Sequence, residues 1–102
     1  MLARVARYEV ASERIDDAVQ AFGEAAKTVQ EQNGFAGGYV LVDYEDGRTM
    51  TLTLWENQAA ADSSESVARS ARTNAANAVG GSVLSVEQFD VAQELNARAS
   101  GV

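Results

Sequence analysis

Residues 49–55 (TMTLTLW) alternate strictly between two kinds of side chain, and no other segment constrains the fold as tightly. A period of two is typical of a β-strand, here with threonine and tryptophan on one face and large aliphatic groups on the other. The preceding segment 38–45 (GYVLVDYE) is rich in β-branched and aromatic residues, and Asp46-Gly47 is a turn signal between the two segments. The sequence therefore predicts an antiparallel hairpin.

The N-terminal segment predicts a strand followed by a helix. Residues 2–10 alternate between one side with Leu2, Ala6, Tyr8 and Val10 and another with Ala3, Val5, Arg7 and Glu9. We expect Ser12 to cap a helix over about residues 13–32 that ends at Asn33-Gly34. The apolar stripe of this helix recurs at helical spacing in Ile15, Val19, Phe22, Ala26 and Val29.

The second half of the chain repeats the helix-then-strand order. Asn57 is expected to cap a helix over about residues 58–79, which Gly80-Gly81 ends. Its inward candidates are small: Ala60, Ala61, Ser64, Val67, Ala68, Ala71, Ala75 and Ala78. Its arginines, Arg69 and Arg72, are expected to face water, and Glu65 to pair with Arg69. A last strand follows over residues 82–91.

The predicted order of elements is β-α-β-β-α-β. A chain of 102 residues has room for one domain, which we expect over residues 1–91, followed by a C-terminal tail over residues 92–102 that is either frayed or a short helix through Leu95. The rules on short connections and crossover handedness favour an α+β, ferredoxin-like fold. In that fold a four-stranded antiparallel sheet carries both helices on one face.

Both faces of the predicted sheet carry apolar side chains, although two helices can cover only one face. Strand 82–91, for example, is expected to present Leu84 and Val86 on one side and Val83, Phe89 and Val91 on the other. An uncovered apolar face needs a partner, and the simplest is a second copy related by a two-fold axis. The sequence thus favours a homodimer with a barrel-like core of eight strands over a monomer with an unusually apolar sheet.

Missing residue types exclude several classes of chemistry. The chain has no His and no Cys, which excludes Ser-His-Asp catalysis, thiol nucleophiles, disulfides and thiolate metal sites. We expect no metal and no cofactor. The net charge of -7 disfavours nucleic acid and anionic membranes as partners. Without a membrane-length apolar run or a signal-peptide core at the N-terminus, a cytoplasmic location is expected.

The element order, the Asn33-Gly34-Phe35 stop and the segment 51–57 (TLTLWEN) together resemble the antibiotic biosynthesis monooxygenase (ABM) domains. Those domains form dimeric α+β barrels, with a Gly-Phe pair entering the second strand and a Trp ending the third. The resemblance covers about residues 1–91. It implies a homodimer that binds a small aromatic ligand, and it implies that Trp55 borders a pocket between the sheet and the helices.

The resemblance extends to a haem-degrading branch that has the same Trp and binds iron through a His on its second helix. The absence of His from this chain disfavours that branch. The branch also carries an Asn on its first strand. No Asn lies within residues 1–10, where Ala6 or Arg7 stands near the corresponding position.

Seven residues are candidates for a site. As catalytic residues we consider Trp55, which can form a flat wall for an aromatic ring, and Arg7 and Tyr8, which can stabilise or protonate a substrate anion. The substrate-binding candidates are Thr51, Thr53, Phe22 and Tyr39. Each also has a purely structural reading: core packing for the aromatic groups, strand propensity for the threonines, and a cross-strand ion pair for Arg7.

The resemblance implies a cofactor-independent monooxygenase that acts on an aromatic, polyketide-like phenol or anthrone with O2. Such a substrate is its own reductant, so the protein needs to supply only shape, desolvation and a few hydrogen bonds. The first alternative is a non-catalytic homodimer that binds a small molecule. The second is a structural homodimer whose pocket is closed by packing, since helix 58–79 opposes the sheet with alanines and interiors are usually dense.

Overall fold

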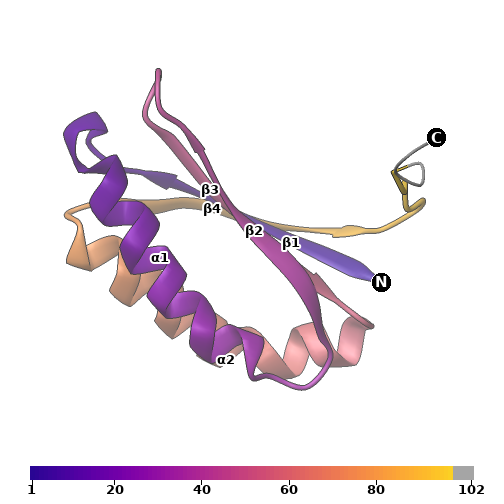
Figure 1. Ribbon diagram of the computed structural model, residues 1–102. Helices are drawn as coiled ribbons and strands as arrows, with labels where there is room; N and C mark the ends of the chain where they lie inside the picture. The colour runs from indigo at the N-terminus through magenta and orange to yellow at the C-terminus, as the bar shows by residue number, and fades with distance from the viewer. Residues whose placement is uncertain (98–102) are drawn as a thin grey trace.

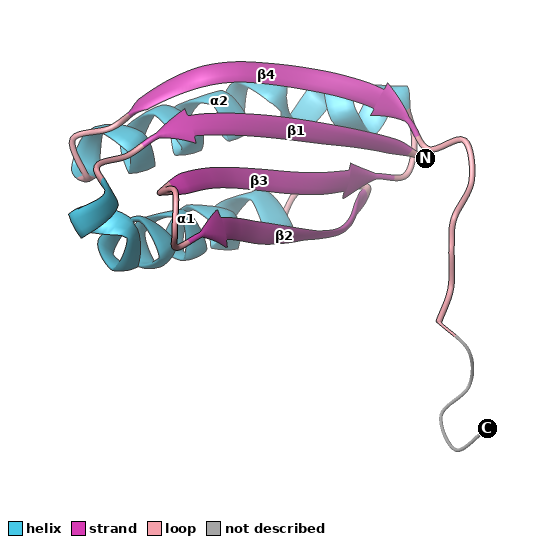
Figure 2. Ribbon diagram, turned by 90° about the horizontal axis from the view of Figure 1, so that it is seen from above, coloured by secondary structure: helices cyan, strands magenta, loops and turns pink. Residues whose placement is uncertain are grey.

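The computed structural model describes residues 1–97 and has one four-stranded antiparallel sheet in the order β2-β3-β1-β4. Its elements are β1 (Leu2–Glu9), a short 3-10 helix (Ser12–Arg14), α1 (Ile15–Gln30), β2 (Phe35–Asp43), β3 (Arg48–Trp55), α2 (Gln58–Ala78) and β4 (Ser82–Asp90). Both helices lie on one side of the sheet, which leaves the other side uncovered (Figures 1 and 2). The predicted ferredoxin-like β-α-β-β-α-β fold is confirmed.

The start of α1 differs from the prediction. The chain enters the helix through the 3-10 turn, in which the Arg14 amide donates to the Ala11 carbonyl at 2.8 Å. The residue at the cap position is therefore Arg14 rather than Ser12, and it makes no side-chain capping bond. Asp16 and Asp17 still place negative charge in the first turn of α1, where the helix dipole favours it.

The start of α2 follows the prediction. The Asn57 side chain accepts a hydrogen bond from the Ala60 amide at 2.8 Å, as an N-cap residue does. The inward face differs toward the C-terminal end, where Ala78 is exposed and Ala76 is buried in its place. A helix of 21 residues rotates its buried stripe along its length, because the packing surface of a twisted sheet is not straight.

The pairing of β1 with β4 shifts register between Arg7 and Tyr8. Val86 pairs with Ala6, and Val83 pairs with Tyr8, so both valines lie on the side of the helices. Phe89 pairs with Ala3 on the uncovered side. The predicted grouping of this strand, with Val86 opposite Val83, is therefore wrong, because the irregularity inserts a residue that strict alternation does not anticipate.

Two clusters of buried side chains lie between the sheet and the helices. One is built around Tyr8 and Phe22, and the other around Trp55, Leu2 and Val29. α2 contributes only alanines to these clusters, and Val79, which follows its last residue, is the other member from this part of the chain. Small side chains on α2 leave part of the layer between sheet and helices unfilled, and that unfilled part is the cavity described below.

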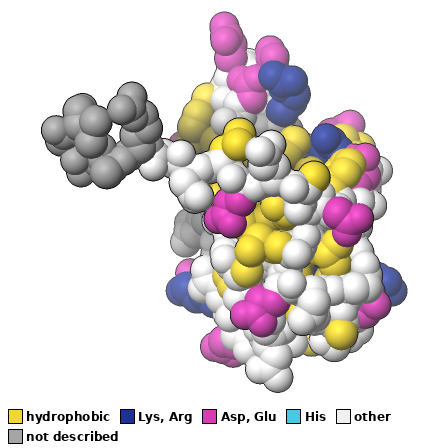
Figure 3. Space-filling view, turned by 90° about the vertical axis from the view of Figure 1, so that its right-hand side faces the viewer, with side chains coloured by type: hydrophobic (Ala, Val, Ile, Leu, Met, Phe, Trp, Pro, Cys, Tyr) yellow, Lys and Arg dark blue, Asp and Glu magenta, His cyan; other side chains and the backbone are white. Residues whose placement is uncertain are grey.

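The uncovered side of the sheet is apolar in its middle. Val5 is buried there, and Leu41 and Phe89, which the strand pairing places on the same side, are exposed by 43% and 49%. Figure 3 views one end of the molecule rather than this face, and there hydrophobic side chains gather toward the middle, with Asp and Glu among them. In the part of the chain that the structure describes, neither helix has the length and hydrophobicity needed to cross a bilayer.

The last described residues, 91–97, form no helix or strand, and Leu95 is exposed. The short helix considered for the tail is therefore absent from this part of it. The remainder of the predicted tail, residues 98–102, lies outside the described residues. Just after β4, the Val91 amide donates to the Met1 carbonyl at 2.9 Å, which holds the start of the tail beside the N-terminus.

Candidate functional site

A cavity of about 290 Å³ lies between the sheet and the two helices. The sheet contributes residues from β1, β2 and β3, and the helices contribute Phe22, Gly23, Ala25, Ala26, Val29 and Gln30 of α1 and Ala68, Ala71 and Arg72 of α2. Thr53 is among the lining residues, so packing does not close the pocket beside it. One alternative was a structural homodimer whose pocket is closed by packing, and its prediction of a closed pocket is therefore wrong.

One part of the cavity wall is aromatic and hydroxylated. Tyr8 projects from β1, and its phenolic oxygen lies 2.9 Å from the hydroxyl oxygen of Thr51 on β3. The Tyr8 ring packs on Phe22 of α1, with the ring centroids 4.2 Å apart. Burial raises the pKa of Tyr8 above its ordinary value, although the bond to Thr51 and the charge of Arg72 oppose this shift. Tyr8 is therefore a neutral hydrogen-bonding group at neutral pH.

Trp55 lies behind the cavity wall rather than on it. Its side chain is completely buried, and its indole nitrogen donates to the hydroxyl oxygen of Thr53 at 3.0 Å. Its ring meets Phe35 edge to face, with centroids 5.5 Å apart. Because Thr53 and Phe35 line the cavity and Trp55 does not, Trp55 holds two lining residues in place.

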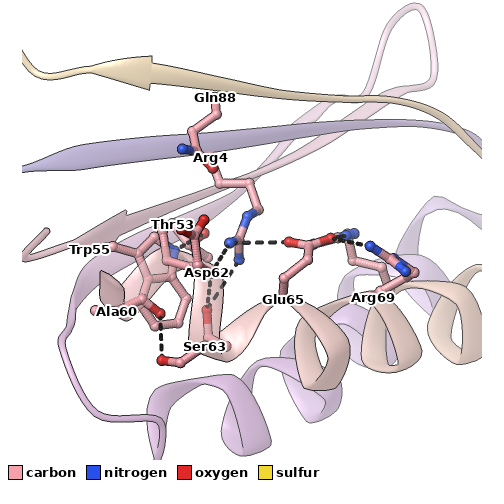
Figure 4. Close-up of polar contacts among 12 residues, drawn as sticks. Arg4, Thr53, Trp55, Ala60, Asp62, Ser63, Glu65, Arg69 and Gln88 are labelled. Atoms are coloured by element: carbon pink, nitrogen blue, oxygen red, sulfur yellow. Dashed lines mark hydrogen bonds and ion pairs between the residues drawn. The ribbon is translucent and has the colours of Figure 1, made fainter. Parts of the chain in front are cut away.

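A second part of the wall is charged, and the sequence prediction did not include it. Arg4 extends from β1 toward α2 and is only 4% exposed (Figure 4). One guanidinium nitrogen, Nη2, donates to the Ala61 carbonyl at 2.6 Å, and the guanidinium carbon lies 5.3 Å from the Trp55 ring centroid. Burial lowers the pKa of Arg4, and the carboxylate of Glu65 acts against this shift.

Glu65 of α2 connects three arginines. One of its carboxylate oxygens lies 3.1 Å from Nη2 of Arg4, and the other lies 2.8 Å from Nη2 of Arg72. The predicted pair with Arg69 is also present at 3.5 Å. Arg69 faces water as expected, whereas Arg72 is only 11% exposed and lines the cavity, so the prediction for Arg72 was wrong.

The structure does not bring Arg7 to the cavity. Successive residues of a strand point to opposite faces, so Arg7 points to the uncovered side while Tyr8 points to the helices. There Arg7 forms an ion pair with Glu87 of β4, and its side chain is 46% exposed. The cross-strand ion pair considered from the sequence is therefore what the structure has, with Glu87 as the partner.

The other candidates divide between the wall and its edge. Phe22, Thr51 and Thr53 line the cavity together with Tyr8. Tyr39 also borders the cavity, but it pairs with Leu52, which pairs with Val5 of the uncovered side, so its side chain points away from the helices and is 68% exposed. Among the described residues, no group of His, Cys, Asp and Glu side chains is arranged to hold a metal ion.

The missed residue Arg4 had a signal in the sequence. Leu2, Ala6 and Tyr8 share a strand face, and residue 4 has the same parity. A charged residue in an otherwise inward-facing row is either an error of register or a buried functional group. Arg72 had no such signal, because helix positions beside a loosely packed region are not distinguished by spacing alone.

Comparison with known proteins adds family and structural relationships. The family model described as antibiotic biosynthesis monooxygenase matches residues 1–76. No curated protein sequence matches the chain significantly. A candidate antibiotic biosynthesis monooxygenase from Deinococcus radiodurans superposes with a TM-score of 0.76 at 15% identity, covering 97% of this chain and 100% of that one.

Two further structures are similar in fold. A mutant of SnoaB, a cofactor-independent oxygenase from Streptomyces nogalater, has a TM-score of 0.72 at 18% identity and covers 94% of this chain and 97% of that one. The haem degrader MhuD from Mycobacterium tuberculosis, with two haems bound in its active site, has a TM-score of 0.70 at 23% identity. That comparison covers 94% of this chain and 100% of the other.

Proposed function

Because the chain belongs to the antibiotic biosynthesis monooxygenase family, we propose that it is a cofactor-independent monooxygenase of an electron-rich aromatic phenol or anthrone. The observation that carries this proposal is the cavity of about 290 Å³ whose wall joins aromatic rings to the Tyr8–Thr51 hydroxyl pair. Such a wall can hold a flat ring and place a polar edge group. The cofactor-independent oxygenase SnoaB has a similar fold, which is consistent with the proposal.

The proposed reaction needs no redox group from the protein. An anthrone loses a proton to give its enolate, and the enolate passes one electron to O2. The resulting substrate radical and superoxide combine into a peroxide anion, which takes up one proton to give a hydroperoxide. The hydroperoxide loses water and leaves the quinone. One O2 is consumed, one oxygen atom enters the product and the other leaves as water. The substrate supplies all the electrons.

The hydroxyl pair supports the difficult step, which is formation of the substrate anion. Tyr8 is buried and protonated, so it can donate a hydrogen bond to the substrate oxygen as negative charge develops on it. Thr51 orients the phenol by its bond at 2.9 Å. Arg72 adds a positive charge that is felt at Tyr8. In a partly desolvated cavity these groups stabilise an enolate more than water does.

The alternative, a non-catalytic homodimer that binds a small molecule, has one observation in its favour. In the part of the chain that the structure describes, no residue that lines the cavity carries a carboxylate, an imidazole or an amine. The wall thus offers no ordinary proton acceptor, and a proton would have to leave to water. A binding protein needs no such acceptor.

The residues of this cavity do not fit haem, which the MhuD structure contains. The chain has no His to bind the iron. Tyr8 is held to Thr51 with a raised pKa, which disfavours the phenolate that iron would need. On α2, Ser64 is completely buried and its hydroxyl already donates to the Ala61 carbonyl at 2.9 Å. We therefore derive no step through haem.

The proposal includes a homodimer formed through the uncovered side of the sheet. The exposed Leu41 and Phe89 lie on β2 and β4, the two edge strands, and the buried Val5 lies on β1 between β3 and β4. A second copy would remove this apolar surface from water, at about 25 cal/mol for each Å² buried. A cytoplasmic location and the absence of nucleic acid and membrane partners are also part of the proposal.

The experiment that tests the proposal is O2 uptake with dithranol, a hydroxylated anthrone, measured with an oxygen electrode. We expect uptake above the protein-free rate, with one quinone formed for each O2 consumed. A binding protein would instead give a saturable change in Trp55 fluorescence without uptake. Uptake that is equal in wild type and Tyr8→Phe would indicate background autoxidation and would contradict the proposed site.

A further inference from the structure

Among the described residues that line the cavity, arginine is the only charged residue type. Arg4 and Arg72 line the cavity, and no Asp, Glu or Lys within residues 1–97 does so. The chain as a whole has 8 basic and 15 acidic residues, so two buried or nearly buried arginines at one cavity run against its overall charge. A cation taken out of water is costly unless an anion compensates it, which makes this placement informative.

The two guanidinium groups have donors to spare. Arg4 donates through Nη2 to the Ala61 carbonyl and through Nη1, at 3.5 Å, to the hydroxyl of Ser64. Within the described chain, the Nε of Arg4 has no hydrogen-bond acceptor, and Arg72 donates only through Nη2, to Glu65. A guanidinium group has five N–H donors in a planar fork, an arrangement that matches a carboxylate.

The compensating acidic groups lie on the other side of the arginines. A second hollow of about 500 Å³, between α2 and β4, is lined by Asp62, Glu65 and Glu87. Arg4 and Arg72 are the two residues that line both spaces, so their side chains form the partition between them. Figure 4 shows Arg4 reaching from β1 to this partition, with Glu65 between Arg4 and Arg69.

Glu65 does not neutralise its arginines. It is one carboxylate shared by three guanidinium groups, and Glu87 is already paired with Arg7. Asp62 acts on Arg4 only at longer range. The side of the partition that faces the first cavity is therefore positive, and the other described residues that line this cavity are uncharged.

We propose that Arg4 and Arg72 form a subsite for an acidic substituent of the ligand, so that the natural substrate is an aromatic carboxylate. This inference rests on the proposed function, because it takes the cavity as the substrate site. Arg4 and Tyr8 are four residues apart on one face of β1, about 13 Å at the usual rise of a strand. The substrate would lie along β1, with its carboxylate at the arginines and its reacting oxygen at Tyr8.

The test compares an anthraquinone carboxylate with the corresponding carboxamide by isothermal titration calorimetry. The two probes have nearly the same shape, so a difference in affinity reports the charge. We expect the carboxylate to bind about tenfold more tightly or better. Arg72→Gln should remove this preference and leave the carboxamide affinity within about twofold. Arg72→Lys, which keeps the charge, should restore part of it.

Arg69→Gln is the matched control. Arg69 contacts the same Glu65 but is exposed and does not line the first cavity, so this variant should keep the full preference. Equal affinity of the two probes for wild type would overturn the subsite. An equal loss of both probes in Arg72→Gln would also overturn it, because that outcome indicates a structural role.

The subsite and the proposed activity fail in different experiments. If dithranol, which has no carboxylate, is oxidised but the two probes bind equally, the oxygenase proposal stands and the subsite falls. If the carboxylate is preferred and neither dithranol nor a hydroxyanthrone carboxylate supports O2 uptake, the subsite stands and the oxygenase proposal falls. If neither probe binds, the subsite is wrong whatever the activity.

Discussion

Tyr8 pairs directly with Thr49 in the register of β1 and β3, yet its hydroxyl bonds to Thr51, two residues farther along β3, at 2.9 Å. The long Tyr side chain leans along the strand, so its polar end passes its own partner. Thr49 is 3% exposed, and its hydroxyl oxygen has no hydrogen-bond partner in the described chain. The Tyr8 phenol therefore bonds to Thr51, which lines the cavity, and leaves the buried hydroxyl of Thr49 without a hydrogen bond in the described chain.

This difference predicts opposite results for the same substitution at two positions. Thr49→Val removes a buried hydroxyl without a partner and should leave the free energy of unfolding unchanged or raise it by up to about 1 kcal/mol. Thr51→Val removes a satisfied hydroxyl and should lower it by about 1 kcal/mol. Urea denaturation of the two variants measures both effects. A loss of stability in Thr49→Val equal to that in Thr51→Val would show that Thr49 has a partner in solution, such as a buried water.

The Tyr8 hydroxyl should matter for turnover more than for folding. Tyr8→Phe keeps the ring on Phe22 and removes the donor to the substrate oxygen, so the rate of O2 uptake with dithranol should fall about a hundredfold. The matched control is Tyr44→Phe, the same chemical change at a ring that is 65% exposed in the hairpin turn. An unchanged rate in Tyr8→Phe, or an equal loss in both variants, would remove Tyr8 from the mechanism.

The raised pKa of Tyr8 predicts a specific loss of stability at alkaline pH. The folded protein keeps the Tyr8 proton in a pH range where the unfolded chain, with its ordinary value of 10.0, releases it. The stabilising contribution is therefore complete below about pH 10 and falls as pH rises above it. Urea midpoints measured from about pH 8 to about pH 11 should decline less steeply in Tyr8→Phe than in wild type. Equal declines would mean that Tyr8 is not desolvated in solution.

The uncovered face of the sheet predicts a dimer that one charge can dissociate. Wild type should sediment at twice the mass of the chain at micromolar concentration, and Phe89→Glu should sediment as a folded monomer. Tyr44→Glu is the control, because it charges an exposed aromatic residue in the turn rather than on the sheet face. A folded wild-type monomer at that concentration would contradict the homodimer.

Gly34 should be intolerant of any side chain. Its φ is +83°, and a Cβ there would clash with the Cβ of Ala60 at the start of α2. Gly34→Ala should therefore lower the free energy of unfolding by about 1–3 kcal/mol. Gly23→Ala is the control, since Gly23 is in α1 with no atom within 4 Å of an added Cβ, and it should stabilise the fold by about 0.5–1 kcal/mol. Thermal unfolding of both variants checks the contrast, and similar Tm values would refute it.

The periodicity of side chains and the capping and turn residues of the sequence predict most of the fold that the structure confirms. The alternation in 49–55, the Asn57 cap and the helical stripe with Phe22 each depend on neighbours within a few residues. Such patterns act through the local conformation of the backbone, so each one corresponds directly to an element of the structure. The two details that differ, the cap predicted at Ser12 and the inward position predicted for Ala78, lie at helix ends, where local preference is weak.

The candidate site, like the fold, could be predicted from the sequence only where local patterns decide. Tyr8, Thr51, Thr53 and Phe22 could be assigned to the side of the helices from parity and helical spacing, because these rules state which face a side chain occupies. They do not predict which residues of other elements lie against that face. Arg4 was passed over although it shares the parity of Tyr8, and Arg7 was preferred although it has the opposite parity.

The sequence by itself therefore determined the order of the elements, the faces of the central strands and the exclusion of histidine and cysteine chemistry. Only the tertiary structure decided that the alanines of α2 leave a cavity, that Arg4 and Arg72 meet at its wall, and that Glu65 lies between them. The physical reason is distance along the chain: Arg4 and Glu65 are 61 positions apart, and their contact at 3.1 Å depends on how a sheet and a helix dock. Periodicity describes one element at a time, whereas a cavity and its charges belong to the space between elements.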